Sequence, residues 1–199
     1  MKRIMALVIL FAAGAAVLWQ PAQHAAAPEH SPQYTEDGKL IAPRNYREWV
    51  FLSSGLGMTY SKGSPNNNPM FTNVFVAPEA YHAFLQTGQW PDKTILMMDM
   101  YTSGTEGSIN KGGHYQLENM GGFEAHVKDT SRPGDPWKFY GFDAKDTSAE
   151  ARPNGNACTT CHIKNGGVED TFVQFYPTLL PVARAKGTLR PGTDVAATK

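Results

Sequence analysis

Thr94-Ile-Leu-Met-Met-Asp-Met-Tyr101 is an apolar stretch in the middle of a chain of 199 residues, and it decides the fold. A run of this length and composition predicts a β-strand. Side chains of a strand alternate between its two faces. One face of this strand would therefore carry Leu96, Met98 and Met100, and the other would carry Ile95 and Met97.

Three further strands are predicted around it. Phe71–Val76 and Trp137–Phe142 are rich in aromatic and β-branched residues, and Phe123–Lys128 alternates between apolar and polar side chains. Pro78 suits the first turn of a helix that follows the first of these strands, and Gly88 suits its end. Several strands with a few short helices predict an α+β fold with a mostly antiparallel sheet.

Cys158-Thr-Thr-Cys-His162 contains both cysteines of the chain. The spacing Cys-x-x-Cys-His is the signature of covalent haem attachment. Two thiols one helical turn apart can each add to one of the two vinyl groups on one porphyrin edge, and the adjacent imidazole can then bind the iron. The motif predicts one covalent haem c per chain, attached through Cys158 and Cys161, with His162 as the axial ligand.

Other uses of the two cysteines compete with haem. A thioredoxin-type redox pair is expected in a βαβ context, which does not surround this motif. A zinc site would need further ligands, and the chain has no third cysteine. A disulfide between Cys158 and Cys161 would close so short a loop that it would stabilise the fold very little.

The N-terminus has the order of a secretory signal. Lys2 and Arg3 precede an apolar run from Ile4 to Leu18, and small residues follow before Pro28. This order predicts a signal peptide over residues 1–27 and a periplasmic location, with a retained membrane anchor as the alternative. The remainder carries 16 Lys and Arg against 18 Asp and Glu, without a polybasic run, so no nucleic-acid partner is expected.

The segments that flank the predicted sheet differ in composition. Residues 28–45 are polar and contain proline, which predicts an N-terminal extension without a core. Residues 46–52 predict a short helix against the core, and residues 46–185 form the predicted domain. The segment 186–199 predicts a loose C-terminal tail.

Six pieces of sequence together resemble the cytochrome P-460 family, whose relatives include the cytochromes c′-beta. They are Pro43–Val50, Ala77–Tyr81 with Thr87-Gly88, Pro91–Thr94, Gly122–Asp129, Cys158–His162 and Phe175–Pro177. The resemblance runs from about Lys39 to Ala185. It implies a haem packed against an antiparallel sheet, an iron with an open distal side and a homodimer. Members of the P-460 branch oxidise hydroxylamine or nitric oxide, and the c′-beta branch binds nitric oxide and carbon monoxide.

The chain departs from the P-460 branch at the lysine that this branch bonds to the porphyrin. The matching position is Met98, whereas Lys93 lies five residues earlier and Lys111 lies past a glycine-rich loop. The lysine cross-link is therefore not expected. Thr72 falls at the position of a distal arginine, and Glu124 matches an acidic residue of the family, which makes it the candidate distal group.

These observations predict a monohaem c-type cytochrome that binds or oxidises nitric oxide or hydroxylamine at the haem iron, with a cytochrome as redox partner. An enzyme would be a hydroxylamine or nitric oxide oxidoreductase without the cross-link. Met98, Phe71 and Phe75 are expected to contact the haem. The alternative is an electron carrier with His162 and Met98 both on iron. His126, which shares a strand face with Glu124, is expected to face solvent.

Overall fold

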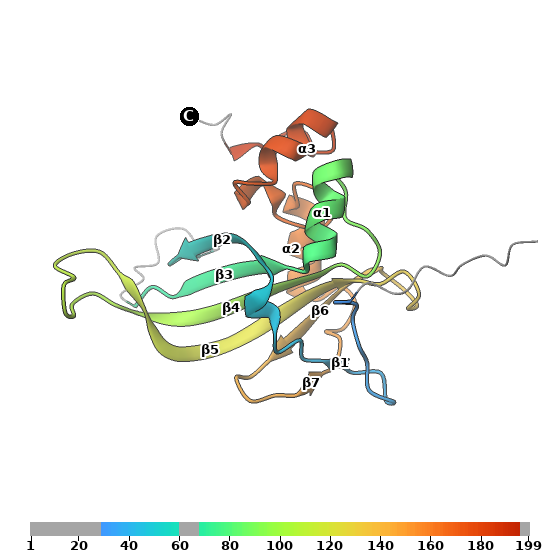
Figure 1. Cartoon of the computed structure of the whole chain (residues 1–199). Coiled ribbons are helices and arrows are strands. Elements are labelled where there is room, and N and C mark those ends of the chain that lie inside the picture. Colours follow the sequence, from blue (N-terminus) through green and yellow to red (C-terminus); the bar gives the residue numbers. More distant parts are fainter. Residues whose placement is uncertain (1–28, 60–67, 196–199) are drawn as a thin grey trace, which may run out of the picture.

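A five-stranded antiparallel sheet in the order β2-β3-β4-β5-β6 forms the centre of the computed structural model, which describes residues 29–59 and 68–195 (Figure 1). The strands are β1 Leu40–Ile41, β2 Val50–Leu56, β3 Phe71–Val76, β4 Ile95–Gly104, β5 Tyr115–Lys128, β6 Trp137–Phe142 and β7 Ser148–Ala149. The helices are η1 Tyr46–Glu48, α1 Pro78–Thr87, α2 Ala157–Asn165, η2 Val173–Phe175 and α3 Leu180–Lys186. The predicted α+β class with a mostly antiparallel sheet is confirmed.

The strand β4 lies at the centre of the sheet, as its apolar sequence predicts. It pairs with β3 on one side and with β5 on the other, with Met98 opposite both Val74 and Glu124. The predicted alternation is also confirmed, because partners across antiparallel strands share a face. The helix α1 begins at Pro78 and ends before Gly88, whose φ of 72° is the left-handed conformation that glycine adopts readily.

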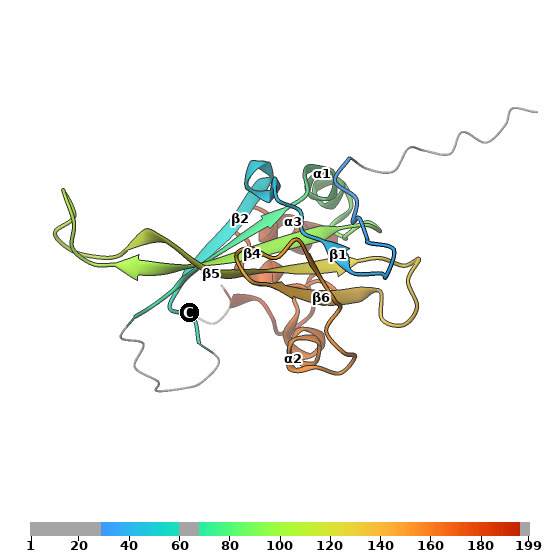
Figure 2. The ribbon, with the colours of Figure 1, turned by 90° about the horizontal axis from the view of Figure 1, so that it is seen from below.

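The two faces of the sheet are covered by different parts of the chain. The helix face is defined by Leu96, Met98, His126 and Phe139. The N-terminal face is defined by Phe75, Met97, Asp99 and Phe123. Figure 1 shows α1 and α3 on one side of the sheet and β1 and β7 on the other. The view from below in Figure 2 shows α2 beside β6.

The segment before the sheet is part of the core, so the prediction of an extension without a core was wrong. The side chain of Leu40 is fully buried, Ala42 is also buried, and β1 pairs with β7. These two apolar residues cover the N-terminal face, a role that the polar composition of the segment concealed. The chain therefore needs this segment to close its core.

Two other local predictions were also wrong. Residues 46–52 form the single turn η1 and then enter β2, because Val50 and Phe51 pair with β3. The segment after α3 is docked rather than loose, since the Thr188 hydroxyl donates to the carbonyl of Gly88. The predicted signal, residues 1–27, and the last residues, 196–199, lie outside the described part of the chain. None of the described helices has the length and apolar character that crossing a membrane requires.

Candidate functional site

The Cys-x-x-Cys-His motif begins the helix α2. The side chain of Asn156 caps this helix by accepting a hydrogen bond from the backbone N–H of Thr159 (3.1 Å). Residues three apart lie on the same side of a helix, so Cys158 and Cys161 project to one side. Both thiols are free and half-buried. The helix therefore presents two neighbouring thiols, as the thioether chemistry requires.

The imidazole of His162 is oriented by the loop that follows α2. Its Nδ1 lies 2.7 Å from the carbonyl oxygen of Asp170. A carbonyl can only accept a hydrogen bond, so Nδ1 carries the proton and Nε2 carries the lone pair. Burial also lowers the pKa of His162, which favours the neutral ring. A neutral imidazole whose second nitrogen is held by a carbonyl has the properties of an axial metal ligand.

The loop that supplies this carbonyl is itself tightly fixed. A Cβ at Gly166 would come within 2.5 Å of the Glu169 carbonyl oxygen, so the turn after α2 admits only glycine. The Glu169 carboxylate lies 2.8 Å from both Trp137 Nε1 and Lys128 Nζ, which anchors the loop to the sheet. Arg190 donates to the carbonyls of Ile163 and Glu169 and so joins the end of α2 to the loop.

Three rings surround the imidazole of His162. The rings of His126 and Phe139 belong to the helix face, and their centroids lie 5.0 and 4.7 Å from that of His162. The ring of Phe172 belongs to the loop, and its centroid lies 4.1 Å from that of His162. The rings of His126 and Phe139 stack on one another at 3.9 Å. The axial histidine candidate is thus held between the sheet and the loop.

His126 is buried, and the expectation that it faces solvent was wrong. It is only 8% exposed, and its Nε2 has no hydrogen-bond partner among the described residues. Burial and the neighbouring His162 lower its pKa well below the ordinary value. The error has a physical reason, because α2 covers this strand face through contacts that the alternation within β5 does not reveal.

Of the predicted haem contacts, the structure places one on the helix face and two on the opposite face. Met98 is half-buried and shares the helix face with His126. Phe71 and Phe75 pair with Tyr101 and Met97 and therefore lie on the N-terminal face. The Phe75 ring contacts the rings of Tyr46 and Phe51. Both rings thus lie on the opposite face of the sheet from His126, and their contact with a haem stays a prediction.

The helix face also carries a charged pair. Glu124 Oε1 accepts a hydrogen bond from Arg152 Nη2 at 3.0 Å, and the Glu124 side chain is 28% exposed. The backbone of Arg152 is fixed, because its N–H donates to the carbonyl of Phe139 (2.8 Å). Its guanidinium lies against Gly141, where a Cβ would approach Nη2 to 2.5 Å. Sequence reasoning missed Arg152, which lies in an irregular segment without a motif.

The two lysines considered for a porphyrin bond are placed elsewhere. Lys93 precedes β4 in a turn, with a φ of 65°, and pairs with the carboxylate of Asp129. Lys111 lies in the exposed loop between β4 and β5. Thr72, opposite Met100 in the sheet, lies on the helix face. The arginine on this face therefore comes from the segment before α2 and not from β3.

The comparisons with known proteins give one family. A family model described as Cytochrome P460 matches residues 43–173, which include the sheet from β2 to β6 and the Cys158–His162 motif. The matched range is narrower than the resemblance seen in the sequence, but it spans most of it. The curated proteins contain no match to this chain.

Proposed function

Since the chain belongs to the cytochrome P-460 family and is therefore a haem cytochrome, we propose that it is an exported c-type cytochrome that binds or oxidises nitric oxide or hydroxylamine. The observation that carries this proposal is the hydrogen bond from His162 Nδ1 to the Asp170 carbonyl, which leaves Nε2 available to iron. Residues 1–27 would direct the chain to the periplasm.

The attachment of the haem would use both thiols of α2. They are free and lie one helical turn apart, and the chain holds no other cysteine, so we expect one haem per chain. When bound, the haem supplies an iron that changes oxidation state and takes a small ligand. The intact mass should equal the mature chain plus one haem joined through two thioethers. A haem peptide that includes Lys93 or Lys111 would contradict this.

The chain's own residues on the helix face would act on the small ligand. The Arg152 guanidinium can donate a hydrogen bond to an oxygen of a bound nitrogen oxide. Glu124 uses Oε1 for Arg152, whereas Oε2 has no hydrogen bond with another described residue and can accept one from an N–H or O–H group. Glu124 is thus the group that would take a proton from hydroxylamine, and the hydrogen bond from Arg152 would hold its carboxylate in place.

Met98 separates this proposal from the electron-carrier alternative. A thioether on the helix face can pack over the haem and leave the iron open, or it can bind the iron opposite His162. We expect the open site, with a five-coordinate ferrous protein that binds nitric oxide and carbon monoxide. Absorption spectra of both oxidation states test this. If the wild type is low-spin and Met98→Ala makes it high-spin, the electron carrier is the correct function.

Turnover separates an oxidoreductase from a gas binder. Hydroxylamine oxidation with a soluble electron acceptor should fall at least tenfold in Glu124→Gln if the carboxylate takes the proton. The control is Glu118→Gln, which changes an exposed carboxylate on β5. Ligand binding without turnover in the wild type would leave a gas-binding protein, which the proposal includes.

The partners would be a redox cytochrome and a second copy of the chain. The hairpin that joins β4 and β5 extends beyond the rest of the sheet, and it exposes Ile109, Tyr115 and Leu117 (Figure 2). Exposed apolar side chains on an extended hairpin favour a protein contact. Light scattering should give the mass of a homodimer, and Leu117→Glu should shift it toward the monomer. A monomeric wild type would contradict the dimer.

A further inference from the structure

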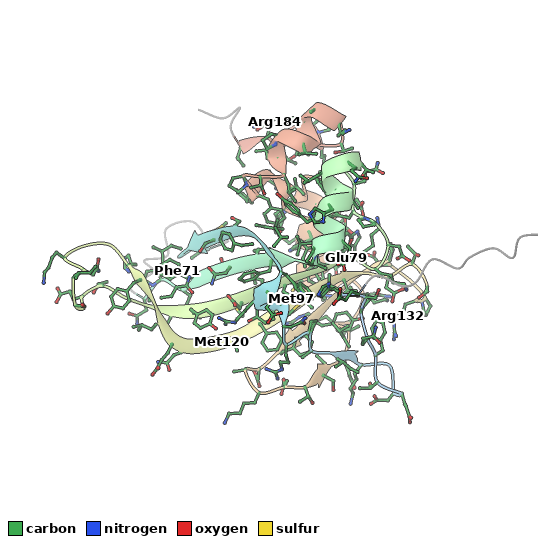
Figure 3. All side chains as sticks on the ribbon, in the orientation of Figure 1. Phe71, Glu79, Met97, Met120, Arg132 and Arg184 are labelled. Carbon is green, nitrogen blue, oxygen red and sulfur yellow. The ribbon has the colours of Figure 1, made fainter. Side chains whose placement is uncertain are left out.

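Two segments that are distant in sequence bring three possible metal ligands together at the start of α1. Glu29 and His30 lie at the start of the described chain, and Glu79 lies in the first turn of α1, at the base of that helix in Figure 3. One ligand atom from each residue lies within 4.8 Å of the other two. His30 Nδ1 lies 3.0 and 3.1 Å from the two carboxylate oxygens of Glu79.

A separate observation points to a bound group at this place. Glu29, His30 and Trp49 line a cavity of about 310 Å³. The Trp49 ring packs edge-on against His30 at 5.5 Å and is only 6% exposed, yet its indole N–H has no acceptor among the described residues. Buried donors are almost always paired, by protein or by ordered water. The Trp49 indole N–H beside His30 therefore lacks an acceptor that a bound group could supply.

We propose that Glu29, His30 and Glu79 bind a divalent cation of the zinc class, with a water molecule at the remaining position inside the cavity. Zinc takes imidazole nitrogen and carboxylate oxygen at about 2.0–2.2 Å, which separates tetrahedral ligands by about 3.4 Å. His30 Nδ1 and the Glu79 carboxylate already lie 3.0 Å apart, and the Glu29 carboxylate lies within 4.8 Å of both. Two carboxylates and a neutral imidazole also balance the charge of the cation.

The type of ligand selects the cation. Calcium takes six to eight oxygen ligands, and magnesium keeps most of its water, so an imidazole with two carboxylates suits neither. Imidazole suits zinc, copper and nickel. Three protein ligands with one water is the open arrangement of zinc sites. The indole N–H of Trp49 would donate to that water and fix its position.

The cation would join the start of the mature chain to α1. Without it, a hydrogen bond between His30 and Glu79 connects the two segments. The metal would replace this bond by direct ligation from both segments and would add Glu29. Ligation through His30 Nδ1 requires that nitrogen to be unprotonated, so the ring proton would lie on Nε2. We expect zinc to slow amide hydrogen exchange over residues 29–33.

Calorimetric titration of the haem-loaded secreted protein with zinc chloride tests the site. We expect one zinc per chain and at least tenfold weaker binding in both His30→Ala and Glu79→Gln. The Glu79→Gln side chain keeps its shape, and an unchanged haem absorption spectrum verifies the fold of each variant. The matched control is His114→Ala, which removes an exposed histidine in the loop between β4 and β5 and should leave the zinc affinity unchanged.

Two results would overturn the proposal. One is the absence of zinc binding, and the other is equal affinity in the wild type and in both ligand variants. Zinc-edge X-ray absorption provides an independent readout, because it should show a single imidazole among oxygen ligands. Absence of an imidazole from the zinc ligands would mean that the cation had bound outside this cluster.

Discussion

The Asp99 cluster on the N-terminal face and His126 on the helix face are buried polar groups that differ in their hydrogen bonding. On the N-terminal face, the Asp99 carboxylate accepts hydrogen bonds from the Tyr46 hydroxyl and from Asn73 Nδ2, both at 2.9 Å. On the helix face, His126 is nearly as deeply buried, but its Nε2 has no partner among the described residues. The Asp99 carboxylate thus has its hydrogen-bond partners within the chain, whereas the His126 nitrogen beside the candidate iron ligand has none among the described residues.

This difference separates a structural polar cluster from the surroundings of the candidate iron ligand. Buried polar groups are normally paired, so the unpaired His126 nitrogen next to His162 distinguishes this place from the Asp99 cluster. The Asp99 cluster needs nothing further, because Arg47 Nη2 also lies 3.2 Å from the carboxylate. The helix face should therefore respond to changes in the haem, and the N-terminal face should respond only to changes in stability.

The largest expected effect is on the helix face. Cys158→Ala combined with Cys161→Ala should convert fully retained haem to fully extractable haem, because no other cysteine can form a thioether. Extraction with acidic acetone measures this. Asp99→Ala should retain all of its haem. Extractable haem in the unmutated protein would contradict covalent attachment.

The next effect is on the N-terminal face. Asp99→Ala removes the acceptor of the buried Tyr46 hydroxyl and one of the two acceptors of Asn73 Nδ2, which should lower the free energy of unfolding by about 3–5 kcal/mol. Urea denaturation measures it. The exposed Glu118, changed to alanine, should cost less than about 0.5 kcal/mol. Equal effects of the two substitutions would show that the buried network contributes little.

A smaller and pH-dependent effect is expected at Asp129, which connects the N-terminal segment to the sheet. Burial opposes its ionisation, but hydrogen bonds from Lys93, Ser131 and Tyr34 outweigh burial and lower the pKa of Asp129 to about 2. The unfolded carboxyl titrates near 3.8, so this stabilisation is complete above that pH and is lost as the pH falls toward 2.

The change Asp129→Asn should remove this contribution, about 2 kcal/mol at neutral pH. Urea midpoints should then differ between wild type and variant at pH 7 and converge as the pH approaches 2. Asp143→Asn, at an exposed position, provides the control. A difference that persists unchanged at pH 2 would mean that packing, and not charge, is responsible.

The smallest effect is expected for His126→Phe on the helix face. At pH 8 this change removes no hydrogen bond within the described chain and keeps a ring against Phe139, so the free energy of unfolding should change by less than about 1 kcal/mol. Urea denaturation of the haem-loaded protein measures this. A loss above about 2 kcal/mol would show that the His126 nitrogen gains a partner when haem is present.

The sequence predicted the parts of this molecule that depend on local pattern. The alternation of its side chains predicted which residues of β4 share a face. Pro78 and Gly88 predicted where α1 begins and ends. The Cys-x-x-Cys-His motif predicted two thiols one helical turn apart in α2. His126 was assigned to solvent because each strand has two faces, and the alternation does not show which of them is covered. Which face α2 covers depends on contacts between segments distant in sequence.

The same limit explains the missed residues. Arg152 lies 28 positions from Glu124, in a segment whose composition has no periodicity. Leu40 was assigned to an extension because its neighbours are polar, although one buried leucine suffices to anchor β1. Neither the Arg152–Glu124 pair nor the pairing of β1 with β7 has a sequence signal, so only the folded chain shows these contacts.

Arg190 has a consequence for the order in which the protein matures. It belongs to the last ten residues of the chain, yet it joins the end of α2 to the loop that carries the Asp170 carbonyl. A chain that is exported from its N-terminus delivers α2 before it delivers Arg190. If the chain is exported as proposed, the thiols of Cys158 and Cys161 would be available for haem attachment before Arg190 fixes the loop that orients His162.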